Sequence, residues 1–97
     1  MSVYMIGAVT VNNLENYAPY IEGAFASVAK YGVEPLAYGE PRIIEGDAPS
    51  ERIVMLKFKD NAAFEEWYNS QEYQSVRSVR LANAATPFIF TIDGLDA

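Results

Sequence analysis

The chain has 97 residues, 51% of them hydrophobic and 13% aromatic, and carries a net charge of −6 with a pI near 4.4. This length predicts one domain, residues 1–97, with a thin core, because a chain so short hides only about 60–65% of the surface of its unfolded form. The acidic balance argues against a nucleic acid or an anionic membrane as partner, since its seven Lys and Arg residues are scattered.

Two residue types are missing altogether, cysteine and histidine. Their absence excludes disulfides, thiolate nucleophiles and Cys-based zinc or iron–sulfur sites, and removes the commonest general base and metal ligand. We therefore expect neither a metal nor a cofactor. The N-terminal residues do not read as a signal peptide, and no apolar run approaches the roughly 20 residues that cross a bilayer, so we expect a soluble cytoplasmic protein.

The first predicted elements are a strand and a long helix. Residues 3–11, VYMIGAVTV, are dense in β-branched residues and too short for a buried helix, which indicates a strand. Over residues 14–30 the apolar side chains recur with a helical period. Asn12 or Asn13 can cap the start of this helix, and Gly32 supplies its stop.

The middle of the chain predicts three more strands. Proline and glycine interrupt the stretch after Gly32, so only two short strands fit there, over residues 36–38 and 42–45, before a turn over residues 46–50. Residues 52–60, RIVMLKFKD, form the next strand, which is apolar on one face and mixed on the other.

The last third of the chain predicts a helix pair and a final strand. Asp60 caps a short helix over residues 61–68, and Ser70 restarts a second helix over about residues 71–84. FIFTI, residues 88–92, is the last strand. The order is that of an α+β ferredoxin-like fold, β-α-β-β-α-β, in which an antiparallel sheet carries its helices on one face.

The other face of this sheet has no helix of its own to cover it. With strands in the expected register it carries an apolar patch made of Tyr4, Ile6, Ala8, Ile53, Met55 and Ile89. A patch of this size calls for a partner, and the simplest partner is the same face of a second copy, packed sheet on sheet. We therefore expect a homodimer.

Two runs of sequence, EGDAPSERIVMLKF and WYNSQEYQSVRSVR, closely resemble a small bacterial family, the domain of unknown function thirteen-thirty, of the dimeric α+β barrel superfamily. Its pattern is an acidic-Gly-acidic turn, Pro, Arg, a strand ending in Phe, then Trp-Tyr-x-Ser-x-x-Tyr-Gln and a final Arg. These elements fall on Glu45, Gly46, Asp47, Pro49, Arg52, Phe58, Trp67, Tyr68, Ser70, Tyr73, Gln74 and Arg80. Tyr17 and Tyr20 match a Tyr-x-x-Tyr in the first helix of the family.

The chain departs from the family pattern at two places. Relatives usually carry Asp-Pro before the first helix, where this chain has Asn12 and Asn13, and Arg-Gly-Gly after the second strand, where it has Tyr38, Gly39 and Glu40. The missing Arg puts any shared anion site that depends on it in doubt. The resemblance implies the ferredoxin-like fold and the dimer, and no established reaction.

An aromatic stretch, residues 64–77, contains the first candidate site residues. Phe64, Trp67 and Tyr68 share one helical face, which indicates packing on the sheet. The polar ends of Trp67, Tyr68 and Tyr73 need partners if buried, and a ligand in a pocket could be one. With Arg80, these three residues are candidates for ligand binding.

The remaining candidates lie in the turn EGDAPSER, at a predicted cleft and on the sheet face opposite the helices. Glu45 could act in acid/base chemistry, although carboxylates in a Gly-Pro turn more often hold the turn. Tyr20 and Tyr38 could handle protons, while Arg42 or Arg52 could stabilise an anion at a cleft. Tyr4 is a further ligand-binding candidate, because its side chain, like that of Lys57, should point to the uncovered face of the sheet.

Two functions remain open on this evidence. One is a small homodimeric binding or interaction module without catalysis, favoured by the lack of His, Cys and any nucleophile with its base. The alternative is a cofactor-independent enzyme, similar to isomerases or monooxygenases of the superfamily, acting on a small aromatic or conjugated substrate. A pocket with a buried carboxylate or arginine would favour the enzyme.

Overall fold

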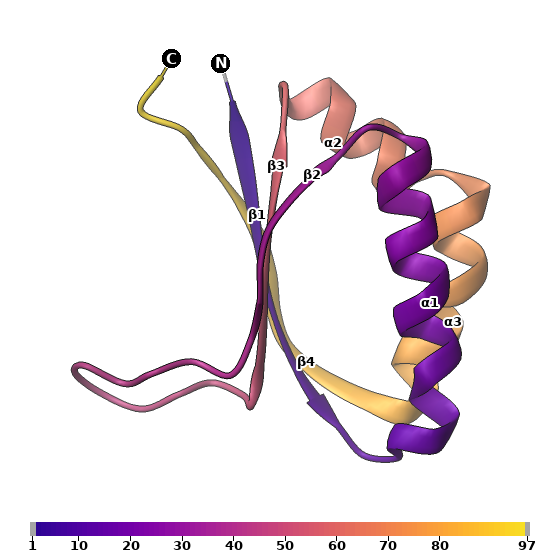
Figure 1. Ribbon diagram of the computed structural model, residues 1–97, viewed down its shortest axis with the longest axis vertical. Coiled ribbons are helices and arrows are strands. Elements are labelled where there is room, and N and C mark those ends of the chain that lie inside the picture. Colours follow the sequence, from indigo (N-terminus) through magenta and orange to yellow (C-terminus); the bar gives the residue numbers. More distant parts are fainter. Residues whose placement is uncertain (1, 97) are drawn as a thin grey trace.

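The computed structural model describes residues 2–96 as one four-stranded antiparallel sheet with its helices on one face (Figure 1). The strand order is β2-β3-β1-β4. The predicted ferredoxin-like α+β fold is therefore confirmed. In chain order the elements are β1 (Val3–Val11), α1 (Leu14–Lys30), β2 (Glu34–Gly39), β3 (Arg52–Phe58), α2 (Asn61–Tyr68), α3 (Gln71–Asn83) and β4 (Ala84–Asp93).

Each helix begins at the polar residue that the sequence places before it. The side chains of Asn13, Asp60 and Ser70 accept hydrogen bonds from backbone N–H groups three residues further on, at 3.1, 2.8 and 3.1 Å. At the end of α1, Gly32 has a φ of 67°, the left-handed conformation that glycine adopts without strain. Its N–H and that of Val33 bond back into the last turn as a Schellman motif.

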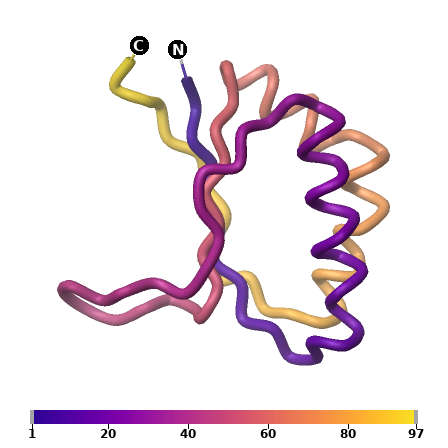
Figure 2. The backbone as a smooth tube through the Cα atoms, in the orientation of Figure 1, coloured from indigo at the N-terminus to yellow at the C-terminus, as the bar shows by residue number. Residues whose placement is uncertain are grey.

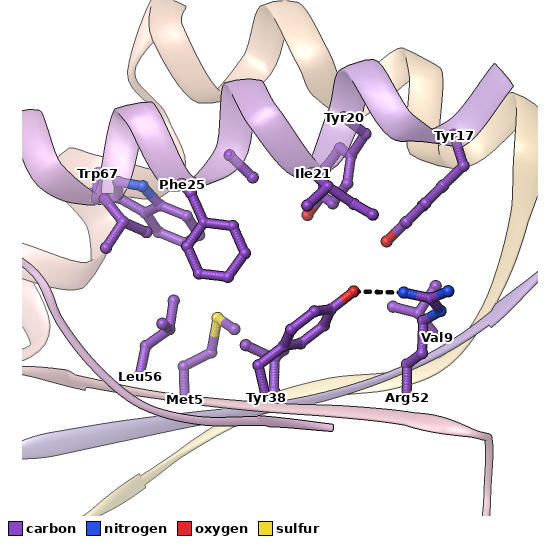
Figure 3. A pocket seen from close by; sticks show the side chains of 13 residues that line it. Met5, Val9, Tyr17, Tyr20, Ile21, Phe25, Tyr38, Arg52, Leu56 and Trp67 are labelled. Atoms are coloured by element: carbon purple, nitrogen blue, oxygen red, sulfur yellow. Dashed lines mark hydrogen bonds between the residues drawn. The ribbon is translucent and has the colours of Figure 1, made fainter. Parts of the chain in front are cut away.

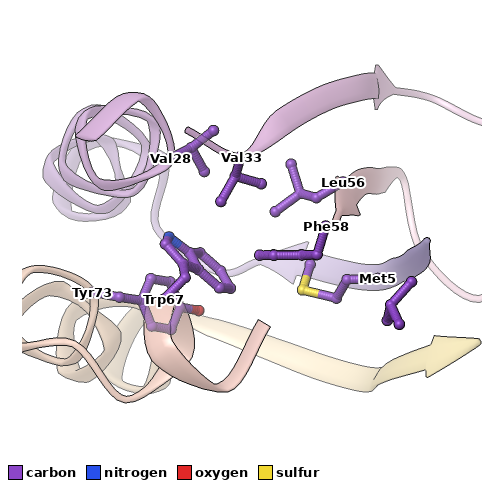
Figure 4. Close-up of a cluster of buried hydrophobic side chains, with 8 residues drawn as sticks. Met5, Val28, Val33, Leu56, Phe58, Trp67 and Tyr73 are labelled. Atoms are coloured by element: carbon purple, nitrogen blue, oxygen red, sulfur yellow. The ribbon is translucent and has the colours of Figure 1, made fainter. Parts of the chain in front are cut away.

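The core lies between the sheet and the helices, where the aromatic side chains of α2 and α3 meet the strands (Figure 4). Trp67 is at its centre, with ring centroids 4.3 Å from Tyr73 and 5.6 Å from Phe58. This confirms the packing role predicted for the aromatic stretch. The buried side chains of the cluster are Val3, Met5, Val28, Val33, Leu56, Phe58, Trp67 and Tyr73.

The second short strand predicted between β2 and β3, over residues 42–45, does not form. Residues 40–51 instead make a loop, here called the arm, that runs beyond the end of the sheet and forms no ladder with any strand. The arm projects on the side of the sheet opposite the helices (Figure 1, Figure 2). Ile44 near its tip is 90% exposed.

The uncovered face of the sheet, here called the open face, carries more aromatic surface than the sequence predicts. Residues opposite one another in the sheet share a face, and the register places Phe88, Phe90 and Ile92 beside Ala8, Ile6 and Tyr4. The open face thus comprises Tyr4, Ile6, Ala8, Ile53, Met55, Phe88, Phe90 and Ile92.

The predicted position of Ile89 on this face is wrong. Ile89 lies opposite Gly7 and packs against the core, on the helix side of the sheet. Gly7 has no side chain, and Ile89 fills that space: a Cβ added to Gly7 would lie 3.4 Å from Cγ1 of Ile89.

The last strand is longer than predicted, because α3 ends at Asn83 and β4 starts at the next residue. Pro87 lies inside this strand. Between Ala8 and Thr10 of β1 the register shifts, which places Pro87 in a bulge of an edge strand, where its missing N–H breaks no ladder.

An ion pair links α1 to α3 at the end of α1, and it predicts how stability responds to acid. Lys30 and Tyr31 donate hydrogen bonds to Glu72, and these hold the pKa of its carboxyl at about 2, below the ordinary 4.5. A carboxyl with a lowered folded-state pKa contributes stability above its unfolded pKa and loses it as the pH falls toward the folded one. Glu72→Gln should therefore lose stability relative to wild type at pH 7, and this difference should shrink between about pH 4.5 and 2.

Urea unfolding at several pH values measures this difference. Glu65→Gln, at an exposed position of α2, is the matched control and should track the wild type throughout. A Glu72→Gln difference that stays constant with pH would show that the ion pair contributes nothing to the acid response.

Candidate ligand-binding site

A mainly apolar pocket lies between α1 and the sheet (Figure 3). Its volume is about 60 Å³. Helical spacing on α1 places Tyr17, Ile21 and Phe25 over it, while Met5 of β1 and Leu56 of β3 face it from the sheet. The pocket thus lies where the single helix α1 covers the β2 and β3 side of the sheet.

Three polar groups converge at one end of this pocket. Arg52 is the first residue of β3, and strand alternation puts it on the helix side with Val54 and Leu56. Its Nη1 donates a hydrogen bond of 2.8 Å to the hydroxyl of Tyr38. Figure 3 shows the Tyr17 hydroxyl pointing toward the same guanidinium. A ligand in the pocket would meet all three groups together.

Arg52 is the charged residue among those that line the pocket, and no carboxylate lines it. The adjacent Glu51 is turned away and accepts a 2.9 Å hydrogen bond from the backbone N–H of Val11. The hydrogen bond to Tyr38 raises the pKa of Arg52, and burial raises the pKa of Tyr17 to about 12. The pocket therefore presents the positive charge of Arg52 and the protonated hydroxyl of Tyr17 at neutral pH.

The mouth of the pocket is covered by two aromatic rings. Phe25 of α1 and Tyr38 of β2 form an edge-to-face pair with ring centroids 5.6 Å apart. Both are substantially exposed, 40% and 42%, and every residue of β2 is exposed. This pair spans the gap between α1 and the edge strand.

A second polar cluster lies behind the pocket wall, between α1 and α3. The hydroxyls of Tyr20 and Tyr73 are 2.9 Å apart and hydrogen-bonded. Burial raises the pKa of Tyr20 strongly. Arg80, only 3% exposed, donates to Thr86 and lies with its guanidinium carbon 5.8 Å from the centre of the Tyr20 ring.

At its other end the pocket is closed by Trp67. The indole N–H donates a 3.0 Å hydrogen bond to the hydroxyl of Ser27, which in turn donates to the carbonyl of Ala24 at 2.7 Å. The polar end of Trp67 is therefore satisfied within the protein, so its indole ring contributes an apolar wall.

The structure brings together only some of the candidate residues. Tyr20, Tyr38, Arg52 and Trp67 line the pocket. Tyr68, Tyr73 and Arg80 lie in the layer behind it: the Tyr68 hydroxyl accepts a 3.1 Å hydrogen bond from Nε of Arg77. Tyr4 lies on the open face, and Arg42 and Glu45 lie exposed on the arm.

Tyr17 is a pocket residue that sequence reasoning did not select. It is almost fully buried, and its hydroxyl faces Arg52 from the helix side. The signal that could have found it is the Tyr-x-x-Tyr spacing with Tyr20, because residues three apart on a helix lie on the same face.

Other parts of the described chain offer less. A second hollow of about 260 Å³ lies near the end of α1, between Tyr31 and Phe58, and is rimmed by the exposed side chains of Lys59 and Glu66. No group of three acidic side chains in residues 2–96 is arranged to hold a metal ion.

Comparison with known proteins identifies the family. The model of the family described as Domain of unknown function (DUF1330) matches residues 2–94. The chain is a member of the DUF1330 family. This confirms the resemblance carried by the turn and the aromatic stretch. Among curated proteins, none matches this family member in sequence.

Solved structures show the same fold in proteins of low sequence identity. A protein of unknown function from Rhodopseudomonas palustris has a TM-score of 0.79 at 16% identity, covering 97% of this chain and 82% of its own. A dimeric ferredoxin-like protein of unknown function from Jannaschia sp. CCS1 has a TM-score of 0.69 at 15% identity, covering 97% and 100%. SnoaB, a cofactor-independent oxygenase from Streptomyces nogalater, has a TM-score of 0.70 at 12% identity, covering 96% and 92%.

The longest helix of this DUF1330 protein, α1, has 17 residues. Of the helices in residues 2–96, none combines the length and the hydrophobicity of a membrane-spanning segment.

Proposed function

We propose that this protein is a homodimeric small-molecule-binding module whose ligand, a small planar aromatic or conjugated compound, occupies the pocket between α1 and the sheet. The observation that carries this proposal is the apolar, aromatic-lined cavity on which Tyr17, Tyr38 and Arg52 converge. Ligand sites generally combine apolar walls with a few placed polar groups. Flat aromatic walls such as Phe25 and Trp67 favour a flat ligand.

The dimer part of the proposal rests on the open face. Phe90 and Ile92 are about half exposed there, and they continue an apolar surface that includes Ile6 and Met55. The arm extends on the same side and would lie beside a second sheet packed there (Figure 1). Two neighbouring structures, from Jannaschia sp. CCS1 and Bacteroides fragilis, are described as dimeric proteins.

A thermal-shift screen against aromatic acids, quinones and lactones tests the binding function. A ligand that binds only the folded state, present at ten times its Kd, adds about 1.4 kcal/mol of stability, which corresponds to a rise in Tm of roughly 5–10 °C for a domain of this size. We expect such a rise with at least one compound. No stabilisation by any of these classes would remove the support for binding.

A pair of variants tests whether the ligand binds in the pocket. Ala24 lines the cavity, so Ala24→Leu fills it and should abolish the shift. Ala18 is exposed on the same helix, so Ala18→Leu makes the identical change outside the pocket and should preserve the shift. Equal shifts in both variants would place the ligand elsewhere.

A cofactor-independent enzyme is the second candidate. It is favoured by the Arg52–Tyr38 pair, a fixed positive charge beside an ionisable hydroxyl within an apolar cavity. SnoaB, which shares the fold, is described as a cofactor-independent oxygenase. In this version Tyr38 or Tyr17 moves the proton and Arg52 stabilises an enolate or phenolate. Tyr20 is a poorer choice because its hydroxyl is already bonded to Tyr73.

Incubation of each stabilising compound with the protein separates these two functions. Mass spectrometry of the recovered compound should show it unchanged if the protein only binds. A new product whose rate falls in Arg52→Gln and Tyr38→Phe would establish the enzyme.

A further inference from the structure

The strongest unassigned feature of the pocket is the guanidinium of Arg52, a charge without an anionic partner. Within residues 2–96 its hydrogen-bond acceptor is the hydroxyl of Tyr38, and the carboxylate of Glu51, next to it in sequence, is bound to the backbone of β1. Charge-assisted hydrogen bonds are roughly twice as strong as neutral ones, and a guanidinium can bind a carboxylate through two of them. An oxyanion would therefore be a better partner for Arg52 than Tyr38 is.

A second arginine increases the positive potential from behind. Arg80 is almost completely buried, its Nε has no hydrogen-bond partner, and no carboxylate in residues 2–96 forms an ion pair with it. Burying an isolated charge costs free energy of folding, so a buried guanidinium without a counter-ion points to a role beyond packing. Its guanidinium lies against Tyr20, whose ring lines the pocket. In a protein with a net charge of −6, the pocket is thus lined by one cation without a counter-ion, Arg52, and backed by a second, Arg80, behind the Tyr20 ring.

The neutral hydroxyl of Tyr17 completes an environment suited to an anion. With its pKa raised to about 12 by burial, it keeps its proton at neutral pH and can donate it in a hydrogen bond. Its position facing Arg52 allows the two donors to meet the same oxygen atom (Figure 3).

With Tyr38 and Phe25 at its mouth, the pocket is too small for such a ligand. Its 60 Å³ admits waters, whereas a cavity that binds benzene measures about 150 Å³. Tyr38 covers the mouth against Phe25 and also bonds Arg52. It stands on an exposed edge strand whose pairing is interrupted by a register shift between Pro35 and Ala37. One displacement of the Tyr38 side chain therefore both opens the cavity and frees the guanidinium.

We propose that the pocket selects planar aromatic or conjugated molecules bearing one oxyanion, and that Tyr38 is a gate that holds Arg52 until the oxyanion replaces its hydroxyl. This inference rests on the proposed binding function and specifies the charge of the ligand. The phenol ring swings off Phe25, the anion takes the place of the hydroxyl on Arg52, and Tyr17 donates a further hydrogen bond.

Calorimetric titration with a matched pair of probes, 2-naphthoate and 2-naphthamide, tests the charge preference. The two have the same ring and nearly the same size, and differ in the anionic oxygen. We expect the wild type to bind the carboxylate at least ~10-fold more tightly than the amide, with a preference that falls as salt is raised. Equal affinity for the two probes would overturn the inference and leave the binding function intact.

Arg52→Gln should remove the preference by weakening naphthoate binding at least ~10-fold while changing naphthamide binding little. Arg42→Gln makes the same charge change on the exposed arm and should retain the preference. Should circular dichroism show that Arg52→Gln folds poorly, Arg52→Lys replaces it in the test. Lysine keeps the charge but lacks the planar guanidinium, so its preference for naphthoate over naphthamide should be intermediate.

Tyr38→Phe tests the gate separately. It keeps the ring over the mouth and removes the hydroxyl that competes for Arg52, so naphthoate should bind more tightly than to the wild type. Weaker binding would show that the hydroxyl contacts the ligand and would overturn the gate. If neither probe binds the wild type and the thermal-shift screen is also negative, the proposed function itself fails and this inference fails with it.

Discussion

Replacing Trp67 with alanine is expected to lower the free energy of unfolding by about 3–5 kcal/mol, the cost typical of deleting a buried Trp. Trp67 is 2% exposed, and its indole contacts the rings of Phe58 and Tyr73. The change leaves a cavity at the meeting point of α1, α2, α3 and the sheet, and it removes the donor that bonds Ser27. A domain of this size has only about 5–15 kcal/mol of stability, so the variant should be close to unfolded at 37 °C.

Urea unfolding followed by circular dichroism measures this loss, because Trp67 is the one tryptophan of the chain and its fluorescence disappears with it. Trp67→Phe separates the two contributions: it keeps an aromatic ring and removes the N–H, so its cost should be smaller. Leu81→Ala, at a site 55% exposed on α3, is the control and should cost less than about 1 kcal/mol. A Trp67→Ala loss of that same size would mean that this cluster does not anchor the fold.

Replacing Phe90 with aspartate is expected to convert the proposed homodimer to monomers. Phe90 is 46% exposed at the middle of β4 on the open face, stacked on Phe88 with ring centroids 5.1 Å apart. A sheet-on-sheet contact about a two-fold axis brings two copies of this position into one interface, so the variant buries two uncompensated carboxylates. We expect the dimer Kd to rise by at least ~100-fold.

Light scattering coupled to size exclusion at about 10 µM measures this change directly. The molecular mass should fall from twice the 10.8 kDa chain mass to that of a single chain. Leu81→Asp makes the same kind of change at an exposed position in the helix layer and should leave the dimer intact. Circular dichroism should show both variants folded, since each side chain is about half exposed. A wild type that runs as a monomer, or a Phe90→Asp variant that stays dimeric, would remove the case for this interface.

Local pattern alone was sufficient for most of the fold. The three helices begin where Asn13, Asp60 and Ser70 supply caps, and both helix spacing and strand alternation are properties of neighbouring residues. The aromatic stretch from Phe64 was rightly interpreted as a packing face, since its spacing puts Phe64, Trp67 and Tyr68 together.

The wrong predictions concern features that depend on pairing. Residues 42–45 have strand-like composition, but a strand needs a neighbouring strand to pair with. These residues lie in the arm, beyond the paired residues of β2 and β3. In FIFTI one alternating set is Phe88, Phe90 and Ile92 and the other contains Ile89, so apolar side chains occur on both faces and alternation alone does not say which set faces the helices. The pairing of Ile89 with Gly7 decides it.

The candidate site shows the same division. Composition and spacing determined three features: an acidic chain with a ferredoxin-like fold, an apolar open face, and a core whose aromatic side chains carry polar groups. These features follow from residue type and local period. Composition and spacing could not separate Arg52, which faces the pocket, from Arg42 on the arm, or join Tyr17 to Tyr38. Those two tyrosines are 21 positions apart, on α1 and β2, and only the packing of that helix on that strand brings them to one guanidinium.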